Sequence, residues 1–187
     1  MPLSFKECCC VFENENKFDL FRYYLVEISF PYALQFKGDK RQTRDYLGCV
    51  YSAIVLKDVI ENKKIRDVDR LKIVIKFIAC NIGNLTSIKK ISEKVLPPTV
   101  ESYLEAFRDS YILYKIDRYD VKGKKLLQTL DKYYLVDIGL RYFLLGDKKS
   151  DFGHILENIV YLELVRCGYN AHIGKVDAYN EKKCKKP

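Results

Sequence analysis

Residues 68–136 read VDRLKIVIKFIACNIGNLTSIKKISEKVLPPTVESYLEAFRDSYILYKIDRYDVKGKKLLQTLDKYYLV, and this stretch decides the fold that we predict. Its first part carries apolar residues at helical spacing, which are Val68, Leu71, Ile75, Ile78 and Ile82. Asp67 precedes the run, and Gly83 is placed to end the helix in a left-handed conformation. The stretch therefore begins with one long amphipathic helix.

Two further helices are predicted in the same stretch. Ser87 caps a short helix, and the prolines of Leu96-Pro97-Pro98 force a turn after it. Thr99 is the predicted N-cap of the next helix. The apolar face of that helix consists of Val100, Leu104, Phe107 and Tyr111.

After these helices the apolar period changes from helical to two. Residues 111–116 and 126–136 predict the two strands of a β-hairpin, and residues 121–124 predict its turn. A helix, a short helix, a tight turn, a helix and a hairpin follow one another in the order of a winged helix, whose hairpin tip is the wing. The sequence therefore predicts a winged helix-turn-helix in an α+β, predominantly helical chain.

Both DNA and a protein partner fit such a module. Winged helices that bind DNA place the recognition helix in the major groove and let wing lysines contact phosphates. The candidate nucleic-acid-binding residues are Thr99, Ser102, Lys122, Lys124 and Lys125. Phosphates would repel the acidic stripe on the recognition helix, formed by Glu101, Glu105 and Asp109. The stripe favours protein docking or packing, and DNA contact stays open.

The remaining segments are predicted to be mostly helical. Residues 1–40 favour a short helix, a loop and a second helix. Thr43 is the predicted N-cap of a long amphipathic helix that runs to about Asn62. Residues 152–167 predict a nearly all-apolar helix, and residues 169–173 predict one short strand without a visible partner in the chain.

Composition excludes several classes of protein. The formal net charge of +8 permits contact with nucleic acid or an acidic partner without establishing one. The seven cysteines form no C-x-x-C pair, so we expect reduced thiols. The chain has only two histidines, His154 and His172, and we therefore predict no zinc site. No apolar run approaches the roughly 20 residues that cross a bilayer. We therefore expect a cytoplasmic protein without membrane contact.

The sequence carries no catalytic signature. A phosphate-binding loop needs a glycine-rich motif ahead of a helix, and the glycines of this chain are isolated. Glu157 and Glu163 are carboxylates near His154, but two residues six apart lie on different faces of a helix. No motif holds a nucleophile beside a histidine base. We therefore predict no catalytic residue, no metal and no cofactor.

Several short segments also carry a family resemblance through their order along the chain. They are residues 2–7 (PLSFKE), 55–58 (VLKD), 65–67 (IRD), 82–85 (IGNL), 99–104 (TVESYL) and 133–141 (YYLVDIGLR). In this order they resemble prokaryotic AAA-type ATPases that carry an uncharacterised C-terminal region. The resemblance covers most of residues 1–174, and it implies an ATPase core, a helical lid, a winged helix and a domain similar to restriction-type nucleases. Only the later parts have counterparts in this chain.

The resemblance implies a division of the chain into three parts. These are a helical lid-like region at residues 1–66, a winged-helix domain at residues 67–147, and a truncated nuclease-like remnant with a basic tail at residues 148–187. Glu157 matches the acid on the first helix of such nucleases, but the remaining acids and the lysine do not follow. We therefore expect a non-catalytic binding module that lacks its ATPase core. A nuclease-like enzyme remnant and a fragment without independent function are the alternatives, and the oligomeric state does not follow from the sequence.

Overall fold

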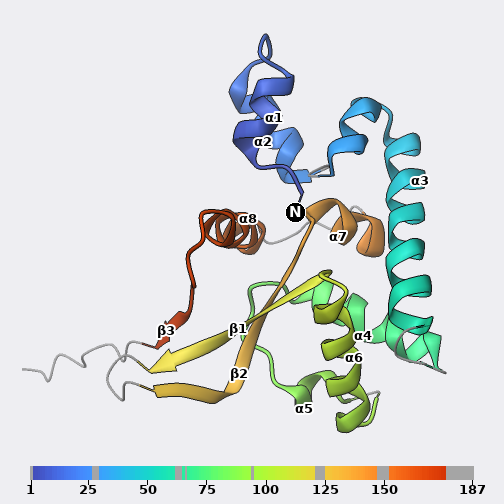
Figure 1. Ribbon diagram of the computed structural model, residues 1–187, viewed down its shortest axis with the longest axis vertical. Coiled ribbons are helices and arrows are strands. Elements are labelled where there is room, and N and C mark those ends of the chain that lie inside the picture. Colours follow the sequence, from blue (N-terminus) through green and yellow to red (C-terminus); the bar gives the residue numbers. More distant parts are fainter. Residues whose placement is uncertain are drawn as a thin grey trace, which may run out of the picture.

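The protein is described by a computed structural model (Figure 1). It describes residues 2–26, 30–61, 65, 67–93, 95–120, 125–146 and 152–175. Helices make up most of this part of the chain, and three strands form one small sheet. The expectation of an α+β, predominantly helical chain is therefore confirmed.

The N-terminal region forms the predicted two helices, α1 (Phe5–Val11) and α2 (Lys17–Val26), which pack against each other. The side chain of Ser4 caps α1 by accepting the backbone N–H of Glu7, whose carboxylate accepts the N–H of Ser4 at 2.7 Å. This reciprocal pair is a capping box, which fixes where the helix begins. A small core joins these helices to the next segment and contains Cys8, Leu20, Tyr24, Ala33 and Leu34.

The following segment is helical in three different forms. It consists of the 3₁₀-helix η1 (Pro31–Phe36), α3 (Lys40–Tyr51) and the π-helix η2 (Ser52–Glu61). The N-cap of α3 is Asp39, whose carboxylate accepts two backbone N–H groups, and not Thr43. The prediction was wrong by four residues because Asp39 offers a capping oxygen one turn earlier.

Helices α4 (Val68–Cys80), α5 (Ile88–Ile91) and α6 (Pro97–Asp109) surround the main core. Helix α4 ends at Cys80, slightly earlier than the sequence predicted. Gly83 lies beyond the C-cap of α4 and has a positive φ of 70°. Ser87 caps α5 as predicted. Thr99 does not cap α6, because the helix already begins at Pro97, whose fixed φ suits the first helical position.

The sheet contains β1 (Leu113–Asp120), β2 (Lys125–Leu135) and β3 (Ile173–Lys175) in the order β2-β1-β3. Strands β1 and β2 form the predicted antiparallel hairpin, with an irregular register beyond Ile116. The short strand β3 does have a partner, contrary to the sequence-based expectation, because it pairs in parallel with β1. Thr86, between α4 and α5, adds an antiparallel bridge to Asp131 of β2.

Two more helices complete the fold. Helix α7 (Ile138–Leu145) was not predicted, and it packs against α3 and α4. Helix α8 (Phe152–Arg166) packs against β2 and is held there by the side chain of Asn158. The amide oxygen of Asn158 accepts the N–H of Leu135, and its amide nitrogen donates to the C=O of Leu135, both at 2.9 Å. No helix among the described residues is both long and apolar enough to cross a membrane.

Candidate functional site

The exposed face of α6 is the first candidate surface. Val100, Tyr103, Leu104, Ala106 and Phe107 are buried against the core and fix the orientation of the helix. Beyond the two exposed prolines of its first turn, the residues of α6 that remain exposed are Glu101, Ser102, Glu105, Arg108 and Asp109. The acidic stripe that the sequence predicted therefore does face solvent.

The predicted nucleic-acid-binding residues are only partly described. Thr99 is half-buried and Ser102 is exposed, and both lie in the first half of α6. Lys125 begins β2, but its side chain lies outside the described part of the structure. Lys122 and Lys124 lie outside the described residues altogether. The structure therefore places Thr99 and Ser102 on the same helix, and it does not describe the tip of the predicted wing.

Helix α5 contributes two lysines that sequence reasoning did not select. Lys89 and Lys90 are exposed, while Ile91 on the other side of this short helix is buried. The hydroxyl of Ser87 accepts the backbone N–H of Lys90 at 3.3 Å. No ion pair of either lysine occurs within the described ranges of the chain, and α5 packs directly against α6. The signal in the sequence was the pattern Ser-Ile-Lys-Lys-Ile, which places two charges opposite two apolar residues.

Glu157 on α8 is the second candidate site, and three side chains surround its carboxylate. Its Oε1 atom accepts Nζ of Lys132 at 2.5 Å and the hydroxyl of Tyr134 at 2.7 Å. His154 Nδ1 lies 3.5 Å from Oε2. Burial raises the pKa of Glu157, but the donors of Lys132 and Tyr134 outweigh it and hold the pKa below its ordinary value. The carboxylate is therefore ionised and already neutralised by Lys132.

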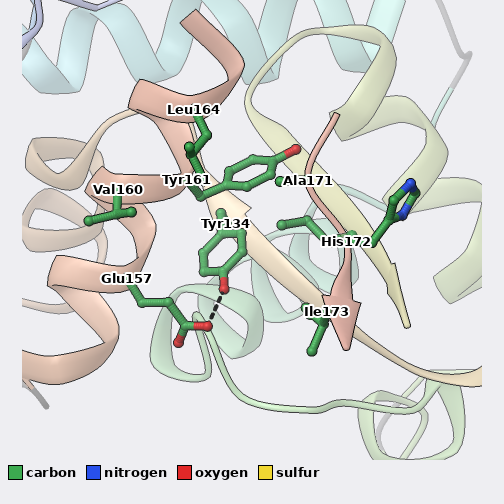
Figure 2. Close-up of a pocket in the computed structure, with 9 residues that line it drawn as sticks. Tyr134, Glu157, Val160, Tyr161, Leu164, Ala171, His172 and Ile173 are labelled. Carbon is green, nitrogen blue, oxygen red and sulfur yellow. Dashed lines mark hydrogen bonds between the residues drawn. The ribbon is translucent and has the colours of Figure 1, made fainter. Parts of the chain in front are cut away.

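A small pocket of about 140 Å³ opens beside this carboxylate (Figure 2). Its wall is mostly apolar, and it is lined by Ile116, Tyr134, Glu157, Val160, Tyr161, Leu164, Ala171, His172 and Ile173. The rings of Tyr134 and Tyr161 stack with centroids 4.9 Å apart. The imidazole of His172 points away from the ring of Tyr134 (Figure 2). The pocket therefore presents two stacked rings and aliphatic groups.

The acidic residues of α8 do not converge on one point. Glu157 faces Lys132, whereas Glu163 accepts Nε of Arg166 at 3.2 Å on the exposed side of the helix. Within the described part of the chain, no three His, Cys, Asp or Glu side chains are grouped closely enough to hold a metal ion. The site around Glu157 is a local ion pair with a hydrogen-bonded tyrosine.

Comparisons with known proteins place the chain among sequences of undetermined function. A family model described as "Domain of unknown function (DUF8612)" matches residues 18–151. An uncharacterized protein of Haemophilus influenzae is 33% identical over 95% of this chain and 46% of its own length. The uncharacterized protein MJ1544 of Methanocaldococcus jannaschii is 29% identical over 90% of this chain and 41% of its own length. The chain thus spans less than half of each of these relatives. No solved structure gives a significant match.

These matches correct the resemblance to prokaryotic AAA-type ATPases. The family model that covers most of the chain is one of unknown function, and neither relative is described as an ATPase. The resemblance rested on the order of six short segments without a catalytic motif among them. Short segments of this kind recur by their apolar spacing in unrelated proteins, so their order was too weak a criterion.

Proposed function

The chain belongs to the DUF8612 family, whose model spans residues 18–151, and we propose that it is a non-catalytic binding module whose winged helix contacts DNA weakly through phosphates. The observation that carries this proposal is the order of elements α4, α5, α6, β1 and β2 around one core. Helix α6 takes the recognition position in this order, and the β1–β2 hairpin takes the position of the wing.

The bridge between Thr86 and Asp131 supports the winged-helix interpretation. The N–H of Thr86 donates to the C=O of Asp131 at 2.8 Å, and the N–H of Asp131 donates back to the C=O of Thr86 at 3.0 Å. The segment between α4 and α5 is therefore tied to the hairpin as a one-residue strand. This tie fixes α5 and α6 relative to the hairpin, so that helix and wing would approach a duplex together.

The charges of the described residues favour contact with phosphates and oppose deep entry into a groove. Lys89 and Lys90 are exposed on α5, which packs against α6. Phosphate contacts by lysine release counterions and carry little sequence information. Glu101 and Glu105 are exposed on α6 and would be repelled by phosphates at close range. The proposed binding is therefore weak, insensitive to sequence and sensitive to salt.

A salt series of fluorescence anisotropy with labelled duplexes tests this function. Each neutralised phosphate contributes about 0.9 to the slope of log affinity against log salt, so Lys89→Ala/Lys90→Ala should flatten the slope by about 2. The matched control is Lys6→Ala/Lys17→Ala, which removes two exposed lysines from α1 and α2. Equal slopes for the parent and the α5 variant would contradict the proposal, as would a parent without measurable binding at low salt.

Two further variants address the predicted wing and the acidic stripe. Removing Lys122, Lys124 and Lys125 together should flatten the slope by about 2 to 3. Glu101→Gln/Glu105→Gln should strengthen binding several-fold at low salt, because two repulsive charges are removed. A strong preference of the parent for one DNA sequence would show that base contacts, and not phosphates, determine binding.

A nuclease-like activity centred on Glu157 has weaker support than DNA binding. Its Oε1 atom already accepts two hydrogen bonds, from Lys132 and Tyr134, and its charge is balanced by the lysine. A metal ion would have to compete with both donors. Plasmid incubated with Mg²⁺ or Mn²⁺ should therefore stay intact, and cleavage that disappears in Glu157→Ala would establish the enzymatic alternative.

A further inference from the structure

A lysine ammonium group is enclosed in the N-terminal part of the molecule. Lys37, the C-cap residue of η1, places its Nζ atom over the ring of Phe12, 4.2 Å from the ring centroid. The centroid of the Tyr23 ring lies 5.2 Å from the same atom. The carboxylate of Glu15 accepts a hydrogen bond from this ammonium group and forms an ion pair with it. We call Phe12, Glu15 and Tyr23 the ammonium cage.

The ammonium cage belongs to α1, α2 and the turn between them, whereas Lys37 comes from the next element. The N–H of Glu15 donates to the C=O of Phe12 at 3.1 Å, so the turn keeps these two residues together. Asn16 fixes the start of α2, the helix that carries Tyr23, because its side-chain oxygen accepts a backbone N–H of that helix at 2.8 Å. Neither contact involves Lys37, so we expect the cage to persist without it.

The ammonium cage is partly open to solvent. The side chain of Glu15 is 42% exposed and that of Lys37 is 24% exposed, while Phe12 and Tyr23 are half-buried. Helices α1 and α2 lie at the top of Figure 1, away from α5 and α6. A dissolved cation can therefore approach the cage without disturbing the surface that we propose for DNA.

The chemistry of the ammonium cage favours a methylated cation over an ordinary amine. Aromatic cages recognise quaternary ammonium groups, because the face of an aromatic ring attracts a cation. The ammonium group of a lysine is strongly hydrated and has three N–H donors. Within the described part of the chain, Glu15 is the only hydrogen-bond acceptor of the Lys37 ammonium group. A quaternary ammonium ion has the same charge and no N–H, so it leaves no donor unpaired when it loses water.

We propose that the ammonium cage is a binding site for small quaternary ammonium ions and that Lys37 closes it from within the chain. The two rings bind the methyl groups of the ion, and the carboxylate of Glu15 balances its charge. Lys37 occupies the same place with its own ammonium group, so it is an autoinhibitory contact. The site shares no residue with the proposed DNA contact, so either proposal can fail alone.

The expected affinity of the emptied cage is modest. Two cation–π contacts and one partly exposed ion pair each stabilise a complex only slightly. We therefore expect a dissociation constant on the order of 10 mM for a quaternary ammonium ion. In the parent protein the tethered Lys37 competes at a high effective concentration, so the same ion should bind at least about tenfold more weakly.

Titration of the full chain with tetramethylammonium chloride tests the proposal, followed by amide signals in nitrogen-15 correlation spectra. Sodium chloride at equal concentration is the reference for general effects of salt. In Lys37→Ala the signals of residues 12–23 should shift in a saturable way with tetramethylammonium and not with sodium. The matched control Lys40→Ala removes a nearby exposed lysine of α3 without emptying the cage, and it should behave like the parent.

Two further variants keep the result interpretable. Lys37→Gln removes the ammonium group and keeps most of the aliphatic stem, so it replaces Lys37→Ala if circular dichroism shows that the latter unfolds. Phe12→Leu in the Lys37→Ala background removes one ring and should weaken binding several-fold. A folded Lys37 variant without saturable shifts overturns the proposal. Equal binding by the parent, or by the variant that lacks Phe12, also overturns it, because the ion then binds elsewhere.

Discussion

Helices α6 and α8 are similar in length and both pack against the β1–β2 hairpin, but their exposed faces differ completely. The outer face of α6 carries Glu101, Glu105 and Asp109, and charges of this kind are stable in water. On α8, by contrast, the apolar side chains of Phe152, Leu156, Val160 and Leu164 remain exposed, and covering such side chains is favourable. Helix α6 therefore exposes mainly charged residues, whereas α8 exposes a row of apolar residues.

The inner faces of the two helices differ as well. Helix α6 is held by apolar contacts, in which Phe107 is fully buried. Helix α8 is held to β2 by the paired hydrogen bonds of Asn158, whose side chain is also fully buried. Apolar contacts tolerate small shifts, whereas two hydrogen bonds to one residue fix both position and orientation. Helix α8 is therefore held on β2 in a defined orientation.

The largest expected effect concerns the inner face of α6. Phe107→Ala should lower the free energy of unfolding by about 3 to 5 kcal/mol, because it removes a buried ring and leaves a cavity. Urea titration followed by circular dichroism measures this loss. Glu105→Ala on the exposed face should change the same free energy by less than about 0.5 kcal/mol. Similar losses in both variants would mean that α6 is not amphipathic in the folded protein.

The corresponding change in α8 should be somewhat smaller. Asn158→Ala leaves the N–H and C=O of Leu135 buried without partners, and each such group costs about 1 to 3 kcal/mol. We expect a loss of about 2 to 4 kcal/mol in the free energy of unfolding. A neutral Asn158→Ala variant would show that α8 is not anchored to β2 through this residue.

The ion pair at Glu157 predicts a modest pH dependence. Its folded pKa lies below the ordinary value of 4.5, so the carboxylate stabilises the folded state above that pH and loses this contribution as pH falls through the folded pKa. Because the side chain is 39% exposed, Glu157→Gln should cost only about 0.5 to 1 kcal/mol at pH 7. Unfolding titrations at several pH values should show the difference between parent and variant disappearing in acid. A difference that grows in acid would contradict this assignment.

The smallest effects are expected at the exposed faces of the two helices. Glu105→Gln on α6 and Val160→Gln on α8 should each change the free energy of unfolding by less than about 0.5 kcal/mol, because both side chains are exposed. Urea titration measures both changes. A loss above about 1 kcal/mol in Val160→Gln would mean that this side chain is packed in the folded protein.

Local patterns made much of the fold predictable from the sequence. Helix α4, the cap at Ser87, the hairpin and α8 all follow from apolar spacing or capping residues over a few positions. The predicted caps at Thr43 and Thr99 were wrong because Asp39 and Pro97 start their helices earlier. Both errors arose because a stronger local signal lay just upstream.

Contacts between distant segments could not be predicted in this way. The parallel pairing of β3 with β1 joins residues more than fifty positions apart, and a parallel pair leaves no turn signal. Helix α7 escaped prediction because its apolar residues show no clear period. Glu157 was recognised in the sequence as a candidate carboxylate. Its hydrogen-bond donors Lys132 and Tyr134 lie on β2, more than twenty positions earlier in the chain, so the sequence did not reveal them.

The most direct test of the account is a titration with a DNA duplex, followed by amide signals in nitrogen-15 correlation spectra. Addition of the duplex at low salt should shift signals of residues 87–102, in and around α5 and α6, and leave those of α8 unchanged. Shifts confined to α8, or an absence of shifts, would contradict the proposed contact of α5 and α6 with DNA.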